Sequence, residues 1–408
     1  MKKILNNKFF VIFLAPFLIG ALTTTSFAPY NLTFINFFSF SILLFLILIV
    51  KKRTQSIYRK KKSNHYFFYL GCAFGFGFFL FGNYWISISL TYDETFKALI
   101  PFALFVIPLL LSIFFGLTIL IIGPLIEKNI YSILLFSLVF SFFEFLRGNI
   151  LSGFPWNLIS YTWSWLPESL QILSIVGVYS LSLISVTFFC TPFIFFQKKI
   201  LKKNIIFLLI ITLIFISNYF YGSNRIDNNN YLYDKNISIK IISPSISLED
   251  YKYKTEISQL EKLIKISNPN KNKKTIFIWP EGLFYESYLQ DLNKYKNLFI
   301  NNFSENHLIV LGINSREKNK YFNSLVVLNH KLEILSVYNK INLVPFGEFL
   351  PLESLLSQFG LKKITKGYNS FSSGDERLMF NLGNKFYNKN ILPLICYEII
   401  YSGKIKKK

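Results

Sequence analysis

Three side chains in the second half of the chain have the chemistry needed for acyl transfer through a thiol. Cys396, Glu281 and Lys340 each follow an apolar run that is typical of a buried strand. A thiolate is a nucleophile, and a carboxylate can take its proton and later return one to a leaving group. An ammonium close to both would lower the pKa of the thiol and stabilise the oxyanion of a tetrahedral intermediate.

Each of these residues also has a purely structural interpretation. Cys396 would be a small buried residue at a strand end, Glu281 a surface or capping carboxylate, and Lys340 a solvated loop lysine. Reactive side chains at three strand ends are, however, the pattern of a site at the carboxyl edge of a sheet. The combination therefore favours the catalytic interpretation.

Histidine and metal chemistry are not indicated by the sequence. His65, His307 and His330 fall in a basic loop, at a predicted strand start and in a predicted turn, which disfavours a Cys–His protease pair. No group of His, Cys and acidic residues has metal-ligand spacing, and three cysteines do not make a disulfide framework. We therefore expect no metal and no cofactor.

The elements that position these residues are predicted from hydrophobic periodicity. After about Asn236 the pattern indicates strands with two intervening helices, including a hairpin around Asn329-His330. This order is typical of a layered α/β or α+β domain. The predicted strands are residues 237–242, 275–279, 307–313, 324–328, 332–338 and 391–396, and the predicted helices are residues 253–266 and 287–303.

The first half of the chain has the composition of a membrane region. Of the 408 residues, 52% are hydrophobic and only 16% are charged. Residues 1–221 contain 17 Lys and Arg and 5 Asp and Glu, whereas residues 222–408 contain 27 and 17. We therefore predict a transmembrane domain of about seven helices in residues 1–221 and an extracytoplasmic domain in residues 222–408.

Seven apolar runs are long enough for helices that cross a bilayer, which takes roughly 20 residues each. The first run resembles a signal peptide that ends at Ser26-Phe27-Ala28, but Pro29 directly after this site disfavours cleavage. The predicted spans are residues 9–26, 33–50, 66–88, 98–123, 130–147, 169–196 and 205–221.

The distribution of basic residues predicts the orientation of the spans. The formal net charge of +22 is of a size found in nucleic-acid-binding proteins. Much of it stands in clusters before the first span, after the second and after the sixth, which indicates membrane topology and no nucleic-acid partner. With seven spans and the N-terminus inside, all three clusters are cytoplasmic and the second domain lies outside.

The loop after the fifth span is rich in aromatic residues, among them Trp156 in the run Gly-Phe-Pro-Trp. These residues form either an aromatic belt at the membrane surface or a wall of a lipid-facing cavity. Glu144 and Arg147, at the end of the fifth span, are expected to form a structural ion pair.

Three sequence blocks resemble the motifs of the nitrilase superfamily. They are Trp279-Pro280-Glu281, Tyr338-Asn339-Lys340 running into Leu343-Val344-Pro345-Phe346-Gly347-Glu348, and Cys396-Tyr397-Glu398. The apolar first half and the Val-Pro-Phe-Gly-Glu wording are similar to one branch, the apolipoprotein N-acyltransferases of bacterial inner membranes. The resemblance covers nearly the whole chain, including the Phe-Pro-Trp loop and Tyr321-Phe322-Asn323-Ser324.

The resemblance implies a multi-span α-helical membrane domain followed by a nitrilase-like α/β domain, an α-β-β-α sandwich. It implies that Cys396 takes an acyl chain from a membrane phospholipid as a thioester and passes it to the α-amine of a diacylglyceryl-cysteine on an apolipoprotein. Glu281 would be the base, and Lys340 would stabilise the oxyanion. The protein would lie in the bacterial inner membrane with this domain on the periplasmic side.

The resemblance also implies residues that support this chemistry. Glu348 and Glu398 would be carboxylates that position Lys340 and the thiol, and Tyr397 would support the site beside Cys396.

Contact with the acyl chain is expected from apolar side chains around the site. Trp156, Phe346 and Tyr397 are the candidates, together with the amphipathic residues 352–361. An ordinary helix packed on the domain is the alternative interpretation of residues 352–361.

The chain departs from the family at its end. The family continues beyond the cysteine block with further strands of the sandwich and a closing transmembrane helix, whereas this chain ends at Lys408 in a basic tail. We therefore expect a C-terminally incomplete domain, and a fragment is favoured over a truncated product. Two other functions stay open: a membrane-anchored nitrilase-like amidase, and an inactive membrane remnant.

Overall fold

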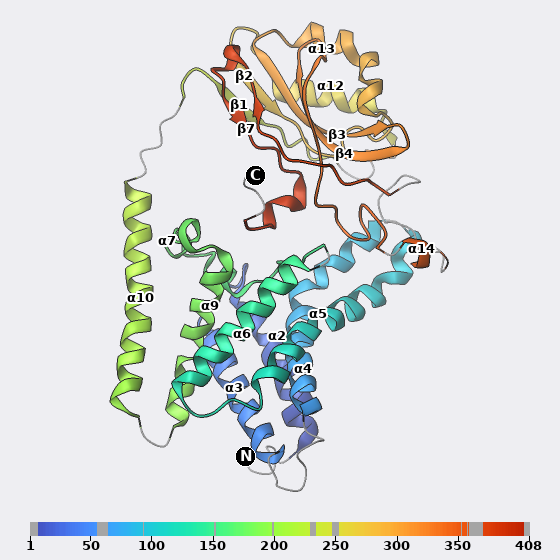
Figure 1. Cartoon of the computed structure of the whole chain (residues 1–408). Helices are drawn as coiled ribbons and strands as arrows, with labels where there is room; N and C mark the ends of the chain where they lie inside the picture. Colours follow the sequence, from blue (N-terminus) through green and yellow to red (C-terminus); the bar gives the residue numbers. More distant parts are fainter. Residues whose placement is uncertain are drawn as a thin grey trace. The chain divides into compact units, whose positions relative to one another are not determined.

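The computed structural model describes residues 7–54, 64–92, 94–150, 152–197, 200–228, 234–246, 253–351, 353–356, 358 and 370–403. The chain divides into two compact units, Met1–Asn230 and Tyr231–Lys408. The first unit is helical and the second contains the β-sheets. Figure 1 labels the elements along the chain.

Six helices of the first unit are long and apolar enough to cross a membrane, counted over the described residues. They are Ile35–Thr54, Asn64–Thr91, Phe96–Ile122, Ile130–Asn149, Val178–Phe196 and Lys202–Asp227. Their α-helical parts are α3 (Ile35–Thr54), α4 (Asn64–Asn83), α5 (Ile100–Ile122), α6 (Ile130–Asn149), α9 (Val178–Phe189) and α10 (Lys202–Asp227). A shorter apolar helix, Phe10–Ser26, precedes them and contains α2 (Ala15–Thr23).

The predicted span at residues 169–196 is wrong in its first part. The apolar run is divided into α7 (Pro167–Leu170), α8 (Leu173–Val176) and then α9. Gly177, between α8 and α9, has a φ of 77°, which a glycine adopts easily and which no α-helical residue has. The membrane-length helix therefore begins only at Val178.

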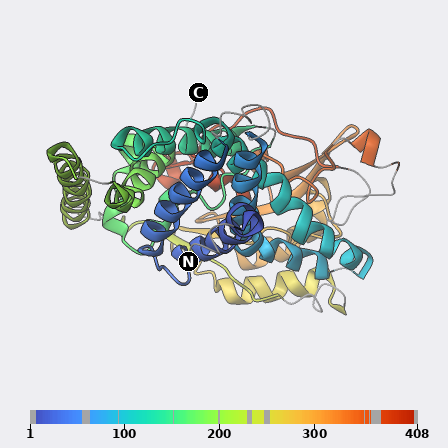
Figure 2. The ribbon, with the colours of Figure 1, turned by 90° about the horizontal axis from the view of Figure 1, so that it is seen from below.

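Glycines on α4 allow its neighbours to pack closely. A Cβ atom on Gly77 would lie 2.1 Å from the carbonyl oxygen of Phe17 on α2, and one on Gly71 would lie 2.4 Å from that of Phe115 on α5. Small residues let helix backbones approach in a membrane, where van der Waals packing drives association. By contrast, α10 stands at one side of the helices in Figures 1 and 2 and packs against α7 and α9.

The second unit is built on a five-stranded sheet of order β1-β2-β3-β4-β5. Its strands are β1 (Ser238–Ile241), β2 (Thr275–Ile278), β3 (His307–Glu317), β4 (Lys320–Asn329) and β5 (Ile334–Asn339). β1, β2 and β3 are parallel, and β4 is antiparallel to both β3 and β5. The carboxyl ends of β1, β2, β3 and β5 therefore meet at one edge, where β4 begins.

Side chains that alternate along the strands fill a core on each face of the sheet. On one face, which α12 (Glu256–Ser267) and α13 (Lys296–Asn302) cover in Figure 1, Phe277 and Ile309 belong to a core shared with residues of both helices. On the other face, Ile276 and Leu308 pack with Phe380 and other side chains of the C-terminal segment. The central strands β2, β3 and β4 are thus largely buried on both faces, whereas the outer strands β1 and β5 are mostly exposed.

The predicted strands are confirmed except for the last one. Regular pairing of the segment that leads to the cysteine is limited to β7 (Asn390–Ile391), which pairs with β6 (Phe380–Asn381). Pro393 has no N–H group to donate to a neighbouring strand, so the ladder cannot continue through it. Cys396 does not end a strand; it begins a 3-10 helix, Cys396–Ile400.

Candidate active site

Glu281 and Lys340 lie at the same edge of the five-stranded sheet. Glu281 follows β2, whose pairing with β3 extends through a hydrogen bond from the Trp279 N–H to the Val310 carbonyl at 2.8 Å. Lys340 directly follows β5, and its N–H donates to the carbonyl of Asn323 on β4, also at 2.8 Å. Because β2 and β5 run in the same direction, both side chains stand at carboxyl ends, as expected from the sequence.

The side-chain amide of Asn323 joins two carboxylates. Its Nδ2 atom donates to Oε1 of Glu281 and to Oε1 of Glu348, each at 2.7 Å. One NH₂ group has two hydrogens, so both bonds can form together. The amide thereby orients both carboxylates and keeps two negative charges apart.

Lys340 and Glu348 form a buried ion pair. The ammonium lies 3.0 Å from Oε1 and 2.9 Å from Oε2 of Glu348, and the Lys340 side chain is 1% exposed. The Val344 N–H also donates to Oε2 at 2.8 Å. A buried cation held by both oxygens of one carboxylate has few rotamers left, so the position of the ammonium is fixed.

Gly312 on β3 makes room for the backbone of Glu281. A Cβ atom at this position would lie 2.9 Å from the Cα atom of Glu281, which is closer than packed carbon atoms approach. Because Gly312 has no side chain, the backbone of Glu281 can lie close to β3 at this position.

Gly312→Ala is expected to displace Glu281 and to lower activity by about 10- to 100-fold, because small misplacements of a reacting group are costly. The free energy of unfolding should fall by only about 1–3 kcal/mol, as in other overpacked sites. Comparing activity with thermal unfolding checks this. Wild-type activity in a folded variant would contradict the assigned contact.

Cys396 has an unusual backbone and an exposed position. Its φ of 49° is in the left-handed region, which costs a non-glycine residue about 1–3 kcal/mol. Partial burial of the thiol and then the negative charge of Glu281 raise its pKa, whereas Lys340 and a hydrogen bond with the Tyr397 backbone lower it. The charges of Glu281 and Lys340 thus act on the thiol. Overall the pKa of the Cys396 thiol is raised, although Lys340 lowers it, as expected from the sequence.

A raised pKa makes the thiolate scarce at neutral pH. We expect the rate of alkylation of Cys396 by iodoacetamide to increase with pH, with a midpoint above the value of about 8.5 for a free cysteine. Mass spectrometry of the peptide that contains Cys396 measures this rate without interference from the other cysteines. A midpoint near pH 7 would contradict the balance of charges described above.

Glu398 is a fully buried carboxylate that joins two parts of the site. Its Oε1 atom accepts hydrogen bonds from the N–H groups of Ile341 and Asn342, both at 3.1 Å and directly after Lys340. Its Oε2 atom accepts one from the N–H of Ile395, directly before Cys396, at 3.0 Å. Glu398 therefore joins residues 395 and 396, which we call the cysteine turn, to the end of β5, whereas Glu348 holds the ammonium.

Family models match both parts of the chain. Residues 19–191 match the model described as apolipoprotein N-acyltransferase N-terminal domain, and residues 276–405 match the model described as carbon-nitrogen hydrolase. The second match contains Glu281, Lys340 and Cys396.

Curated relatives match along most of the chain. The apolipoprotein N-acyltransferase of Rickettsia prowazekii is 32% identical over 347 residues, which cover 82% of this chain and 67% of that protein. The apolipoprotein N-acyltransferase of Brucella melitensis is 27% identical over 409 residues, which cover 96% of this chain and 75% of that protein. That of Rhodopseudomonas palustris is also 27% identical over 409 residues, which cover 95% of this chain and 74% of that protein. The chain belongs to the apolipoprotein N-acyltransferase family.

Membership of this family confirms the fold class expected from the sequence. The chain is a membrane protein with an apolar helical part, followed by a nitrilase-like domain with a mixed sheet.

Two of the residues expected to contact the acyl chain in this family lie in the second unit. Phe346 is 39% exposed and has a φ of 61°, on a turn closed by its N–H and the Phe349 carbonyl at 2.7 Å. Tyr397 is partly buried and meets Tyr401 edge to face, with ring centroids 5.2 Å apart. Glu353–Leu356 forms the short helix α14, and residues 352, 357 and 359–361 of this segment lie outside the described residues.

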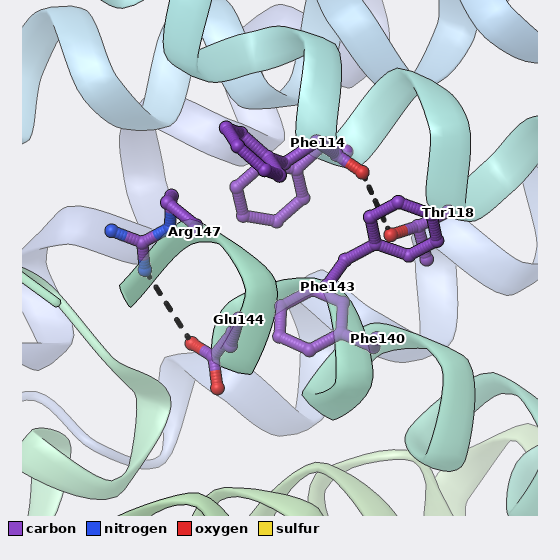
Figure 3. Close-up of a pocket in the computed structure, with 7 residues that line it drawn as sticks. Phe114, Thr118, Phe140, Phe143, Glu144 and Arg147 are labelled. Carbon is purple, nitrogen blue, oxygen red and sulfur yellow. Dashed lines mark hydrogen bonds and ion pairs between the residues drawn. The ribbon is translucent and has the colours of Figure 1, made fainter. Parts of the chain in front are cut away.

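Trp156 lies in the first unit, on a loop that the expected ion pair holds in place. Glu144 and Arg147 on α6 are buried 4.0 Å apart, beside Phe114, Phe140 and Phe143 in the cavity of Figure 3. The guanidinium donates to the carbonyls of Phe154 and Trp156 at 2.6 and 2.7 Å, and Glu144 accepts from the Ile159 N–H at 3.0 Å. The ring of Trp156 packs against that of Trp85, with ring centroids 5.2 Å apart.

Arg147→Met is expected to lower the free energy of unfolding by about 3–5 kcal/mol, because it leaves the buried Glu144 carboxylate without this cation. Thermal unfolding in detergent measures the change. Adding Glu144→Gln to the variant should recover part of the stability, since the buried charge is then removed as well. Equal stability of the wild type and the Arg147→Met variant would contradict a structural ion pair.

Three polar residues of the site had no assigned role in the sequence. Asn323 and Tyr338 belong to the sequence blocks that resemble the family, and Arg377 lies outside them. Tyr338 donates to Oε1 of Glu398 at 2.6 Å, and Arg377 pairs with the same atom at 2.7 Å. Within the part of the chain that the structure describes, no group of three or more His, Cys, Asp and Glu residues lies together as metal ligands.

Proposed function

We propose that the protein transfers a fatty acyl chain from a membrane phospholipid, through a thioester on Cys396, to the N-terminal amine of a diacylglyceryl-cysteine on an apolipoprotein. Family membership and the names of the relatives support lipoprotein N-acylation. The observation that carries the mechanism is that Glu398 joins the backbone directly after Lys340 to the backbone directly before Cys396, at the sheet edge where Glu281 also lies. A base and a cation beside a thiol are the groups that acyl transfer needs.

In the first half-reaction, Glu281 takes the thiol proton and the sulfur attacks the ester carbonyl of the phospholipid. Lys340, fixed by Glu348, stabilises the oxyanion of the tetrahedral intermediate. When the C–O bond breaks, Glu281 gives its proton to the leaving alkoxide, and a lysophospholipid departs. The acyl chain remains on Cys396 as a thioester.

In the second half-reaction, the free amine of the lipoprotein attacks the thioester carbonyl. Lys340 again stabilises the oxyanion, Glu281 takes a proton from the attacking nitrogen, and the C–S bond breaks. The thiolate that leaves takes the proton back from Glu281. The product is an amide, and the thiol and carboxylate return to their starting states.

The proposed location is the bacterial inner membrane, with the second unit on the periplasmic side. We count Phe10–Ser26 as a seventh span before the six longer helices. With this count, the basic residues at the end of α3 and at the start of α10 both lie on the cytoplasmic side. They are Lys51, Lys52 and Arg53 on α3, and Lys202 and Lys203 on α10. A thiol-reactive reagent that does not cross membranes should label Cys396 from the periplasm and not from the cytoplasm. Labelling only from the cytoplasm would reverse the proposed orientation.

An amidase is a second candidate, favoured by the match to the carbon-nitrogen hydrolase model. A test supplies the purified protein with phospholipid vesicles and a synthetic peptide that begins with diacylglyceryl-cysteine. The proposal expects an N-acylated peptide and one lysophospholipid per acyl group transferred. Hydrolysis of a soluble amide, with no peptide acylation, would favour the amidase and overturn the proposal.

A further inference from the structure

A segment of irregular backbone crosses the edge of the sheet where the site lies. We call residues 371–377 the strap. The Ser372 N–H donates to the Tyr321 carbonyl at 2.7 Å, and the Gly374 N–H donates to the Lys340 carbonyl at 2.9 Å. The Phe371 N–H donates to the Glu348 carbonyl, also at 2.9 Å. The Ser373 hydroxyl also donates to the carbonyl of Ile341, at 2.7 Å. The strap is therefore bonded to β4, to the end of β5 and to the loop that carries Glu348.

The strap ends in a buried cation, Arg377, whose side chain is 8% exposed. Its guanidinium donates to Oε1 of Glu398 at 2.7 Å and to the hydroxyl of Tyr338 at 2.8 Å. The same guanidinium lies over the Tyr338 ring, 5.4 Å from its centroid. A guanidinium that combines an ion pair with ring stacking is held in one orientation.

The carboxylate that Arg377 meets is the one that joins the cysteine turn to the end of β5. Glu398 accepts hydrogen bonds from backbone N–H groups on both sides, and its side chain is 0% exposed. A buried carboxylate is costly unless a cation and hydrogen bonds compensate its charge. Among the described residues, the ion pair found for Glu398 is the one with Arg377.

We propose that Arg377 is a positioning residue for the acyl-transfer reaction, and this inference rests on the proposed function. Arg377 keeps the Glu398 carboxylate in place, and Glu398 then holds Cys396 at a fixed position relative to Lys340. In this role Arg377 acts through Glu398. Its sequence neighbours carry no motif, so its role follows from the fold alone.

The left-handed backbone of Cys396 makes this support necessary. A residue with a φ of 49° is strained and persists only where its surroundings hold it. Glu398 bonds the residue directly before the cysteine, so it is placed to hold this conformation. Loss of Arg377 is therefore expected to release the turn and to impair the chemical step more than lipid binding.

The test compares Arg377→Met, Arg377→Lys and a matched control, Arg316→Met, in the full chain. Arg316 is a half-exposed arginine of the same unit that pairs with Asp291 at 3.3 Å. Steady-state acyl transfer from vesicles of phosphatidylethanolamine and phosphatidylglycerol to the diacylglyceryl-cysteine peptide gives kcat and the KM for phospholipid, and iodoacetamide reports the reactivity of Cys396. We expect Arg377→Met to lower kcat by about 10- to 100-fold with KM within about twofold, and to change the alkylation rate at least about threefold.

Arg377→Lys should recover part of kcat, since it restores the charge without the planar fork, and Arg316→Met should match the wild type. Wild-type kcat and alkylation in Arg377→Met would overturn the inference, as would a kcat in Arg377→Lys no higher than in Arg377→Met. If Arg377→Met does not fold, Arg377→Lys is compared with Arg316→Met. The inference then expects a lower kcat in Arg377→Lys, with KM the same in both variants. A wild-type protein that forms no thioester would overturn the proposed function, whereas the alkylation rates would still test the strap.

Discussion

Cys396→Ala is expected to lower acyl transfer by at least about 10³-fold, because the thioester on this residue can no longer form. Its effect should be the largest of any single substitution. Both half-reactions depend on the sulfur, so the variant should release no lysophospholipid and should acylate no peptide. Quantifying both products from one reaction measures this.

Cys72→Ala is the matched control for this experiment. Cys72 is partly buried in α4 of the first unit, and the proposed mechanism does not use it. This variant should retain wild-type activity. Transfer that persists in Cys396→Ala, or that disappears in Cys72→Ala with the fold intact, would contradict Cys396 as the acyl carrier.

Glu281→Gln is expected to lower kcat by about 10²- to 10⁴-fold, the range over which general bases act. Glutamine has the size of glutamate and can still accept the hydrogen bond that Asn323 donates to Oε1 at 2.7 Å, so the geometry should change little. It cannot accept the thiol proton. The raised pKa of Cys396 makes this loss severe, because few molecules are thiolates at neutral pH without a base.

The pH dependence of the Glu281→Gln variant provides its control. Without the base, residual activity should require thiolate from solution and should increase steadily with pH. Because the negative charge of Glu281 is one cause of the raised pKa, the alkylation midpoint of Cys396 should also move to lower pH in this variant. Unchanged kcat at neutral pH, or an alkylation midpoint that moves upward, would contradict the role of Glu281.

The sheet and the positions of Glu281 and Lys340 were predictable because their signals are local. Apolar residues at consecutive strand positions indicate burial on both faces, and the two cores of this sheet confirm it. The hairpin between β4 and β5 places Lys340 beside Asn323 as soon as the register is set. Short-range pattern was therefore sufficient for this edge of the site.

The cysteine turn and the strap were not predictable in the same way. The run before Cys396 is apolar throughout and indicates a strand, yet Pro393 interrupts the ladder and Cys396 takes a left-handed backbone. Arg377 donates a hydrogen bond to Glu398, which lies 21 positions further along the chain, and no sequence periodicity predicts such a contact. Gly177 similarly divides an apolar run that reads as one span. In each case a single residue or a distant partner determined the structure.

Detection of an acyl group on Cys396 itself tests directly whether this residue carries the acyl chain. The wild-type protein is incubated with phospholipid vesicles whose acyl chains carry an isotope label, without an acceptor peptide, and is then digested for mass spectrometry. We predict one labelled acyl group on the peptide that contains Cys396, released by neutral hydroxylamine as a thioester should be. If the protein acylates the peptide in a parallel reaction with acceptor, but Cys396 carries no label here or the label lies on another residue, Cys396 is not the acyl carrier.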